Sequence, residues 1–374
     1  MALSNVNILR QNGGITTQPV DTDGIAGLVF YTANSLTTGK FSLFQASDAS
    51  TIFDADSIEM FHINEYFAKS NYQLFINVVN VLPSTFSEVT ELQRYAEGAI
   101  KICGIFNNKS NFTSSQLNSI QTACNLCETE YQPLQAVYSA SLGGNTIEGT
   151  AGLLDLTTLS NYRVSLTVGQ NLDTNLEPYK SNPTLHIGDI GSVIGTVSSA
   201  KVSECIGFVQ KFDLTNITVP GFIDGSLLNS KPKSFLDSLD AKNYLFIRKF
   251  VGLAGNYYNF DFTATNPSTD DFYRISTNLT YDKAFRALRQ SYLAFVNSSI
   301  KLSKSGEIAG ASVEFLKSIG DTTLNYMKAS DDISDFSVKV SNKLVNNTLE
   351  VVASIVPIGV AKQINIKLGF TLSL

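Results

Sequence analysis

The end of the chain carries the strictest pattern in the sequence. Between residues 364 and 374 apolar and polar side chains alternate without a break. Such alternation indicates a β-strand with one buried face and one face in water. Nothing follows to cover the apolar face, so we expect the strand to pair elsewhere in the subunit or with a second copy. The apolar positions are Ile364, Ile366, Leu368, Phe370, Leu372 and Leu374.

A second apolar stretch, at residues 349–356, precedes this strand. Pro357 and Gly359 lie between the two, at positions that are typical of a tight turn. The pattern therefore predicts a C-terminal β-hairpin arm over residues 346–374. At the other end, Val6 and Ile8 precede a turn cluster and predict a short strand on an N-terminal arm over residues 1–20.

The composition is typical of a folded protein. The chain has 374 residues, of which 43% are hydrophobic and 16% are charged, and this is too apolar for a disordered chain. No stretch approaches the roughly 20 apolar residues of a membrane helix. The first ten residues lack the pattern of a secretory signal. We therefore expect folding in a cytosol, no membrane insertion and about two domains.

Strand-like and helix-like segments alternate over the first 250 residues. This alternation predicts an α/β domain over residues 21–250, with helices on both faces of its sheet. A polar loop is expected between the strand at residues 24–32 and residue 57. Strands are expected at residues 24–32, 72–81, 99–106, 134–140, 163–168, 205–209 and 244–250, and helices at 58–67, 84–97, 113–131, 189–203 and 232–241.

The character of the sequence changes after residue 250. An aromatic and polar stretch leads into two long helical patterns, at residues 282–300 and 310–329. Two strands and the terminal hairpin are expected to follow. We therefore place a second domain at residues 251–345, so that the chain is α/β at its start and α+β overall.

The sequence offers little material for catalysis. The glycine-rich stretch from Gly188 lacks the Lys and Ser/Thr of a phosphate-binding loop. Gly191 and Gly195, four residues apart, are instead expected to allow close helix packing. No nucleophile elbow occurs, and acidic pairs such as Asp270 and Asp271 are typical of turns and helix caps. We predict that the chain is not an enzyme and binds no cofactor.

Metal binding is also disfavoured. Cys124 and Cys127 form the one closely spaced cysteine pair, whereas a structural zinc site needs a second pair or two suitably spaced histidines. The two histidines do not supply this spacing, because His62 lies in an apolar helical segment and His186 lies beside Gly188. We interpret the four cysteines as buried or half-buried thiols.

A basic region stands out in a chain whose net charge is −6. Lys283, Arg286 and Arg289 recur every three residues and are expected to form a stripe along one side of a helix. Two interpretations remain open: an ordinary solvated face, or a surface that docks onto an acidic partner. Nucleic acid is a poorer partner, because the chain is acidic overall and lacks interleaved aromatic and basic residues.

From residue 257 onward the order of motifs resembles the carboxy-terminal part of contractile tail sheath proteins. Residues 195–209 are also similar to the short bacteriophage sheaths. One motif departs from the family, since Asn278-Leu279-Thr280 stands where an Asn-Gly-Arg type of turn is expected. The resemblance rests on Tyr257-Tyr258-Asn259-Phe260-Asp261, on residues 268–284, on the long helix after them, on Gly306-Glu307-Ile308 and on residues 357–370.

The resemblance implies a structural subunit of a virion tail, assembled in the cytoplasm of a bacterial host. Such subunits form a homo-oligomer of stacked helical rings around an inner tail tube protein, together with baseplate and tail terminator proteins. Their contraction drives the tube through a target envelope and consumes no nucleotide. A phage, a tailocin and a secretion-type contractile injection system all remain open.

The resemblance also implies roles for particular residues. Val6, Ile8 and the apolar residues from Ile364 onward would lie in strands that neighbouring subunits exchange. The domain at residues 251–345 would face the tube, with Lys283, Arg286 and Arg289 as candidate contacts. Three alternatives remain: strands that pair within their own subunit, another repeating viral tube or shell protein, and a soluble α/β enzyme.

Overall fold

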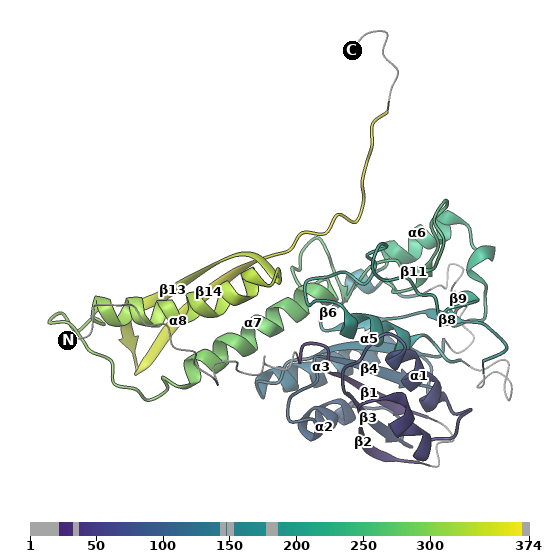
Figure 1. Ribbon diagram of the computed structural model, residues 1–374, viewed down its shortest axis with the longest axis horizontal. Helices are drawn as coiled ribbons and strands as arrows, with labels where there is room; N and C mark the ends of the chain where they lie inside the picture. The colour runs from purple at the N-terminus through teal and green to yellow at the C-terminus, as the bar shows by residue number, and fades with distance from the viewer. Residues whose placement is uncertain (1–21, 33–36, 143–146, 148–152, 177–185, 369–374) are drawn as a thin grey trace, which may run out of the picture.

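The structure is a computed structural model that describes residues 22–32, 37–142, 147, 153–176 and 186–368. An α/β domain is followed by an elongated C-terminal part, in which a long helix leads away from that domain (Figure 1). The predicted fold class is confirmed. Val6, Ile8, Phe370, Leu372 and Leu374 lie outside the described residues.

A six-stranded sheet forms the centre of the α/β domain, in the order β2-β3-β1-β4-β5-β7. Neighbouring strands run parallel except β2, which is antiparallel to β3. The central strands are near-continuous apolar runs because both faces of the sheet are covered. Their bounds are β1 (Ala26–Tyr31), β2 (Gly39–Leu43), β3 (Leu74–Val79), β4 (Ile102–Asn107), β5 (Gln135–Ala140) and β7 (Val164–Leu166).

Helices cover the two faces of this sheet and define two cores. Leu28 and Phe30 of β1 point to one face, which α1 (Ile58–Phe67) and α5 (Ile190–Ser199) cover. Val29 and Tyr31 point to the other face, against α2 (Ser87–Tyr95) and α3 (Ser114–Thr129). Successive side chains of a strand alternate between faces, so one strand contributes to both cores.

The close helix packing expected at Gly191 and Gly195 is confirmed. Both glycines lie on α5 where it meets α1. A Cβ atom at Gly191 would lie 2.3 Å from the His62 carbonyl oxygen, and one at Gly195 would lie 2.9 Å from the Tyr66 carbonyl oxygen. A larger side chain would force the two helices apart, so these glycines set the spacing of the layer.

Short elements surround the sheet. Some residues beyond 250 pack against this sheet, because Tyr258, Phe260 and Phe262 lie in the same core as β1. The division of the chain into domains at residues 20, 250 and 345 stays a prediction. The short elements are η1 (Ala46–Thr51), η2 (Leu156–Thr158), β6 (Ser160–Asn161), β8 (Gly169–Asn171), β9 (Pro220–Phe222), η3 (Leu228–Ser230), α6 (Lys233–Ala241), β10 (Ile247–Arg248), β11 (Tyr257–Tyr258) and β12 (Ala264–Thr265).

Two local predictions in this domain are wrong. The strand expected at residues 205–209 is a series of turns, in which the Phe208 N–H donates to the Cys205 carbonyl at 3.0 Å. No residue of this stretch belongs to a strand. The polar loop expected before residue 57 contains the edge strand β2, where Phe41 and Leu43 alternate with polar side chains.

The C-terminal part begins with α7 (Ile275–Leu293) and α8 (Gly310–Ala329). α8 has the predicted bounds, but α7 starts seven residues before the predicted start at 282. A tertiary contact explains the early start, because the Asp261 carboxylate accepts hydrogen bonds from the Ser276 N–H at 3.1 Å and from its hydroxyl at 2.5 Å. This carboxylate satisfies a free donor of the first turn, as a helix cap does.

A β-hairpin of β13 (Ile333–Val345) and β14 (Thr348–Pro357) packs on α8. The hairpin predicted from residues 349–356 and 364–374 is therefore wrong in its pairing. Its turn lies earlier, at Asn346 and Asn347, with φ angles of 51° and 59°. Asparagine tolerates such angles, and two-residue hairpin turns require them. Residues 358–368 form no helix or strand.

Candidate assembly interface

The β13–β14 hairpin is a sheet of two strands, so each strand has an outer edge. β13 also bonds outside the hairpin, because the Ile308 N–H donates to the Asn342 carbonyl at 2.7 Å. Among the described residues, the backbone of β14 bonds to β13 and to no other strand. Such an edge presents unpaired N–H and C=O groups that can accept another strand.

The segment that follows the hairpin exposes apolar side chains. The exposed fractions of Ile364, Ile366 and Leu368 are 77%, 83% and 95%. Beyond Lys362 the described chain runs away from the rest of the molecule and forms no helix or strand (Figure 1). The alternating residues thus lie in an extended segment whose apolar side chains are exposed to water. Exposure of apolar surface to water is unfavourable, so a partner that buries these side chains would stabilise the segment.

Lys362 fastens the base of this segment to the α/β domain. Its ammonium nitrogen lies 2.6 Å from an Asp240 carboxylate oxygen at the end of α6. It also lies 5.1 Å and 4.2 Å from the ring centroids of Phe260 and Phe262. We call this group the Lys362 clasp. It fixes where the exposed segment leaves the body, five residues after Pro357.

Two of the three predicted tube-contact residues are bound within the subunit. The Lys283 ammonium lies 2.5 Å from an Asp23 oxygen and 2.7 Å from an Asp332 oxygen. Burial lowers the pKa of Lys283, but these two carboxylates outweigh it and leave the pKa raised. The Arg286 guanidinium donates to the Pro133 carbonyl, and burial holds the pKa of Arg286 below its usual value.

The third residue, Arg289, lies with its guanidinium 4.1 Å from the ring centroid of Tyr131. The three basic side chains thus make three different contacts within the subunit. A helix has 3.6 residues per turn, so Lys283 and Arg289 lie roughly 120° apart around its axis. Tube contact by these residues remains a prediction.

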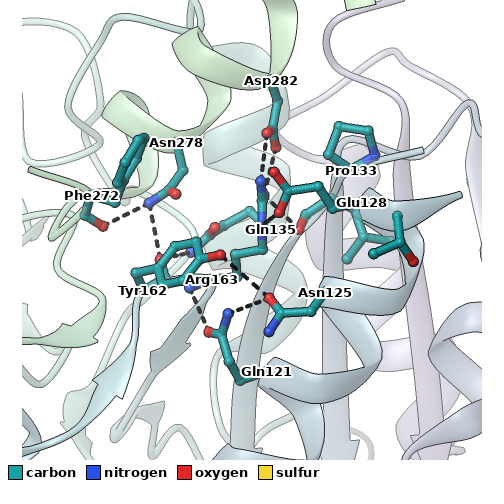
Figure 2. A network of polar contacts seen from close by, with 12 residues as sticks. Gln121, Asn125, Glu128, Pro133, Gln135, Tyr162, Arg163, Phe272, Asn278 and Asp282 are labelled. Carbon is teal, nitrogen blue, oxygen red and sulfur yellow. Dashed lines mark hydrogen bonds and ion pairs between the residues drawn. The ribbon is translucent and has the colours of Figure 1, made fainter. Parts of the chain in front are cut away.

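A buried ion pair joins α7 to the α/β domain (Figure 2). Arg163, just before β7, makes a two-pronged contact with the Asp282 carboxylate of α7, with both distances at 2.9 Å. Its third donor reaches Glu128 of α3 at 3.1 Å. Burial lowers the pKa of Arg163, but the two carboxylates outweigh it and raise the pKa. Removal of one partner would leave a buried charge uncompensated.

Asn278 adds a second link between α7 and the α/β domain. Its side-chain amide donates to the Tyr162 carbonyl at 3.0 Å and to the Phe272 carbonyl at 2.8 Å (Figure 2). Asn278 belongs to the motif that departs from the sheath pattern, and here it lies inside the first turns of α7. The first half of α7 is thus held as part of the α/β domain.

The residues weighed for catalysis and metal binding are dispersed or buried. His62 lies in the core between the rings of Phe30 and Phe106, with centroid distances of 5.8 Å and 5.0 Å. The four cysteines are free and buried, as expected. Within the described ranges, no group of three or more His, Cys, Asp or Glu side chains is arranged to hold a metal ion. None of the helices described there is long and apolar enough to cross a membrane.

Sequence reasoning missed Arg163 and Lys362. A signal for Arg163 was present, because an arginine at the start of an apolar strand is rarely buried without a partner. The partner, Asp282, is 119 positions away and has no local signal. Lys362 is a single lysine in a weakly patterned stretch, and nothing in the sequence points to Asp240 as its partner.

Comparison with known proteins agrees with this architecture. The sequence matches the family models "DUF2586, N-terminal domain" over residues 3–260 and "DUF2586, C-terminal domain" over residues 271–374. A search of curated proteins found no match.

Two solved structures are similar over essentially their whole length. One is the helical sheath of the anti-feeding prophage in its contracted state, with 12% sequence identity, a TM-score of 0.67 and coverage of 100% of both chains. The other belongs to the contracted baseplate of the same prophage, with 12% identity, a TM-score of 0.60 and coverage of 100% of this chain and 99% of that one. The chain belongs to the DUF2586 family, and its fold is that of a contractile sheath protein.

Proposed function

We propose that this chain is a structural subunit of a contractile tail sheath, which polymerises by strand exchange between copies. One observation carries the proposal: an extended segment with exposed Ile364, Ile366 and Leu368 follows a two-stranded hairpin. Among the described residues, no strand pairs with the outer edge of this hairpin at β14. The segment supplies a strand and the hairpin supplies an edge. The likeness to a helical prophage sheath supports assembly into a helical polymer.

The free energy gained when the exposed segment is buried in a link between copies is similar in size to the entropic cost of ordering that segment. Burial of three Ile or Leu side chains would stabilise a link by roughly 5–9 kcal/mol. Ordering five backbone residues costs roughly 5–10 kcal/mol. Hydrogen bonds along the shared edge contribute about 0.5–1.5 kcal/mol each. A single link is therefore weak, and a lattice in which every subunit donates and accepts a strand is stable.

The joint on α7 suits a subunit that moves as one body. Arg163, Asp282 and Asn278 hold the first half of α7 on the α/β domain. The segment after Lys362 is then the natural tether between copies. In this proposal, the bodies slide and rotate during contraction while the tethers keep neighbouring rings connected. The energy comes from repacking of subunit interfaces and not from a nucleotide.

Several parts of the proposal concern partners. The sheath would surround an inner tail tube protein and meet baseplate and tail terminator proteins, after assembly in the cytoplasm of a bacterial host. Lys283, Arg286 and Arg289 stay candidates for contact with the tube. Partly exposed charge pairs contribute about 0–1 kcal/mol each, which suits an interface that must release.

The experiment compares two faces of the same segment. The test variant replaces Ile364, Ile366 and Leu368 by Ser, and the matched control replaces Gln363, Asn365 and Lys367 by Ser. We expect the control to form wide hollow cylinders in negative-stain microscopy, like the unchanged protein. The test variant should keep its circular dichroism spectrum but sediment as a monomer.

Three other results would change the conclusion. Normal cylinders from the test variant would refute strand exchange. Narrow tubes or closed shells from the unchanged protein would favour another repeating viral protein. Small monodisperse particles under all conditions would remove the assembly proposal and leave a soluble protein.

A further inference from the structure

Four basic side chains gather where α7 meets the amino ends of the parallel strands. Lys101 lies just before β4, and Arg163 lies just before β7. Lys283 and Arg286 come from α7. Arg286 reaches the same edge of the sheet, since its guanidinium donates to the carbonyl of Pro133, two residues before β5. Positive charges at such a largely buried place need negative partners.

Two of the four basic side chains are paired within the subunit. Arg163 bonds to both carboxylate oxygens of Asp282, each at 2.9 Å. The Lys283 ammonium lies 2.5 Å from an Asp23 oxygen and 2.7 Å from an Asp332 oxygen. These pairs compensate the charges of Arg163 and Lys283 only.

The other two, Lys101 and Arg286, are buried with less support. The exposed fraction of Lys101 is 8%, yet within the described ranges its ammonium forms no ion pair and no hydrogen bond. The Nε atom of Arg286 is buried and has no hydrogen-bond partner in the part of the chain that the structure describes. Buried polar groups are usually paired, and a buried charge without a partner is costly. A negative group at this place would satisfy both side chains.

The two cations are close enough to act on each other. The pKa of Lys101 is lowered to about 8, chiefly by burial and then by the positive charge of Arg286. The charges of Asp23 and Asp282 act in the opposite direction but do not restore the ordinary value. A negative ion beside the two cations would offset their repulsion and favour the charged form of Lys101.

The chemistry of the two donors indicates the class of ligand. A guanidinium presents its N–H groups in a fixed fork that matches the oxygens of a carboxylate or a phosphate. An ammonium adds a compact charge with three donors. Because Lys101 is almost enclosed, a small ion fits this place better than the surface of another protein.

We propose that Lys101 and Arg286 bind a small oxyanion, of the size of inorganic phosphate, at the joint between α7 and the α/β domain. The ion compensates the two cations and links the edge of the sheet to α7, beside the pair of Arg163 and Asp282. The inference goes beyond the proposed function, because both binding residues belong to one subunit.

Two other places in the molecule fit an anion less well. A groove of about 570 Å³ lies between α7 and α8, but the two charged residues that line it, Lys283 and Asp332, pair with each other. His186 has two buried ring nitrogens without partners among the described residues. Burial lowers the pKa of His186 to about 4, so its ring is neutral near pH 7 and does not attract an anion.

Thermal unfolding of the full chain, at a concentration below that of polymerisation, tests the proposal. The midpoint is measured at pH 7 with and without potassium phosphate, at an equal ionic strength set by potassium chloride. We expect phosphate to raise the midpoint of the unchanged protein, because a ligand that binds only the folded state stabilises it. In Lys101→Met the rise should nearly vanish.

The matched control is Lys233→Met, which removes an exposed ammonium and should leave the rise unchanged. Equal rises in all three proteins would show a general effect of phosphate and overturn the site. Absence of a rise in the unchanged protein would overturn it as well.

Acylation of lysine side chains provides a second measurement that needs no variant. The unchanged protein reacts with an acetyl ester, and mass spectrometry follows Lys101 and Lys233 in the same sample. At a phosphate concentration about ten times the dissociation constant, the reaction at Lys101 should slow about tenfold, because only about a tenth of the sites are then free. The reaction at Lys233 should keep its rate. Protection of both lysines alike, or of neither, would contradict the proposal.

This inference and the proposed function fail in different ways. A chain that binds phosphate at Lys101 but forms no polymer would refute the proposed function and leave the anion site intact. Polymers from a chain in which phosphate protects no lysine would do the reverse.

Discussion

The α/β domain and the C-terminal hairpin differ in how completely their sheets are covered by other elements of the subunit. In the α/β domain, helices cover both faces of a six-stranded sheet, and two large cores result. In the C-terminal part, two strands lie on two helices, and the core there has five buried members. The larger sheet is covered on both faces within the subunit, whereas the hairpin has an edge, at β14, that pairs with no further strand in the described part of the chain.

The difference extends to charged groups. The domain joint buries Arg163 and Asp282 in a fully paired arrangement. The pairs near the hairpin, such as Lys328 with Asp335 at 2.9 Å, are exposed. Buried pairs fix geometry strongly, while exposed pairs are worth little and exchange easily. The molecule thus combines a buried, paired joint with a region of exposed pairs, and in the proposed function another copy supplies further contacts to that region.

The largest expected effect is at the joint between the two regions. Asp282→Ala leaves the Arg163 guanidinium buried beside Glu128 alone, so we expect a loss of about 3–5 kcal/mol in the free energy of unfolding. Urea denaturation followed by circular dichroism measures the loss. The matched control is Asp237→Ala, which removes an exposed partner of Lys233 and should cost less than about 1 kcal/mol. Equal effects would mean that α7 is not clamped.

The next effect tests the completeness of the α/β layer. Gly191→Ala would place a Cβ atom 2.3 Å from the His62 carbonyl oxygen. Because the backbone of α1 must move, we expect a loss of about 3 kcal/mol in stability. Gly310→Ala, at the start of α8, has no atom within 4 Å of the added carbon and should be near neutral. A neutral Gly191→Ala would show that the α1–α5 contact yields easily.

The pH dependence of stability probes the same core. Burial lowers the pKa of His62 to about 3, against an ordinary value near 6.5. Between these values the unfolded chain binds a proton that the folded chain does not, so the His62 contribution weakens stability as pH falls below about 6.5. Burial raises the pKa values of Asp189 and Glu65 to about 7 and acts in the opposite direction.

The substitution His62→Phe removes the contribution of His62 to the pH dependence and leaves the contributions of Asp189 and Glu65. For each protein, we compare the free energy of unfolding at pH 7 and at pH 5. On going to pH 5, this free energy should change in favour of the variant by about 2 kcal/mol relative to the unchanged protein. Any constant cost of losing the hydrogen bond from the Gly191 N–H cancels in the comparison of the two pH values. Parallel stability curves for the two proteins would contradict a neutral, buried His62.

The smallest effect concerns the Lys362 clasp. Lys362→Met should change the stability of the monomer by less than about 1 kcal/mol, because the pair with Asp240 is partly exposed. Spin labels on cysteines introduced at Lys233 and Ile364 report the change in direction. We expect the distance distribution to broaden in Lys362→Met but not in the control Lys367→Met. An unchanged distribution would show that the clasp does not direct the segment.

Much of the α/β domain could be predicted from the sequence because its signals are local. The apolar runs of β3 and β4, the helix at residues 58–67 and the small-residue spacing on α5 each depend on near neighbours. Continuous apolar strands separated by helical patterns leave few other folds. The resemblance to sheath proteins likewise rested on motifs that follow one another in order along the chain.

The rest depended on contacts between distant residues. α7 starts early because Asp261 accepts a hydrogen bond from its first turn. The basic residues of α7 contact Asp23, Pro133 and Tyr131, which are distant in the sequence. The hairpin turn was missed because Pro357 and Gly359 form a stronger turn signal than the Asn pair before β14. A spacing of three along a helix predicts where the basic side chains leave the helix, but it does not predict which group each of them contacts.

Cryo-electron microscopy of the assembled polymer tests strand exchange most directly. The expected map has residues 364–368 of one copy hydrogen-bonded to the hairpin of another copy, in a hollow helical cylinder. A map in which that segment bonds entirely within its own subunit, with no chain from a neighbour at the hairpin, would contradict it.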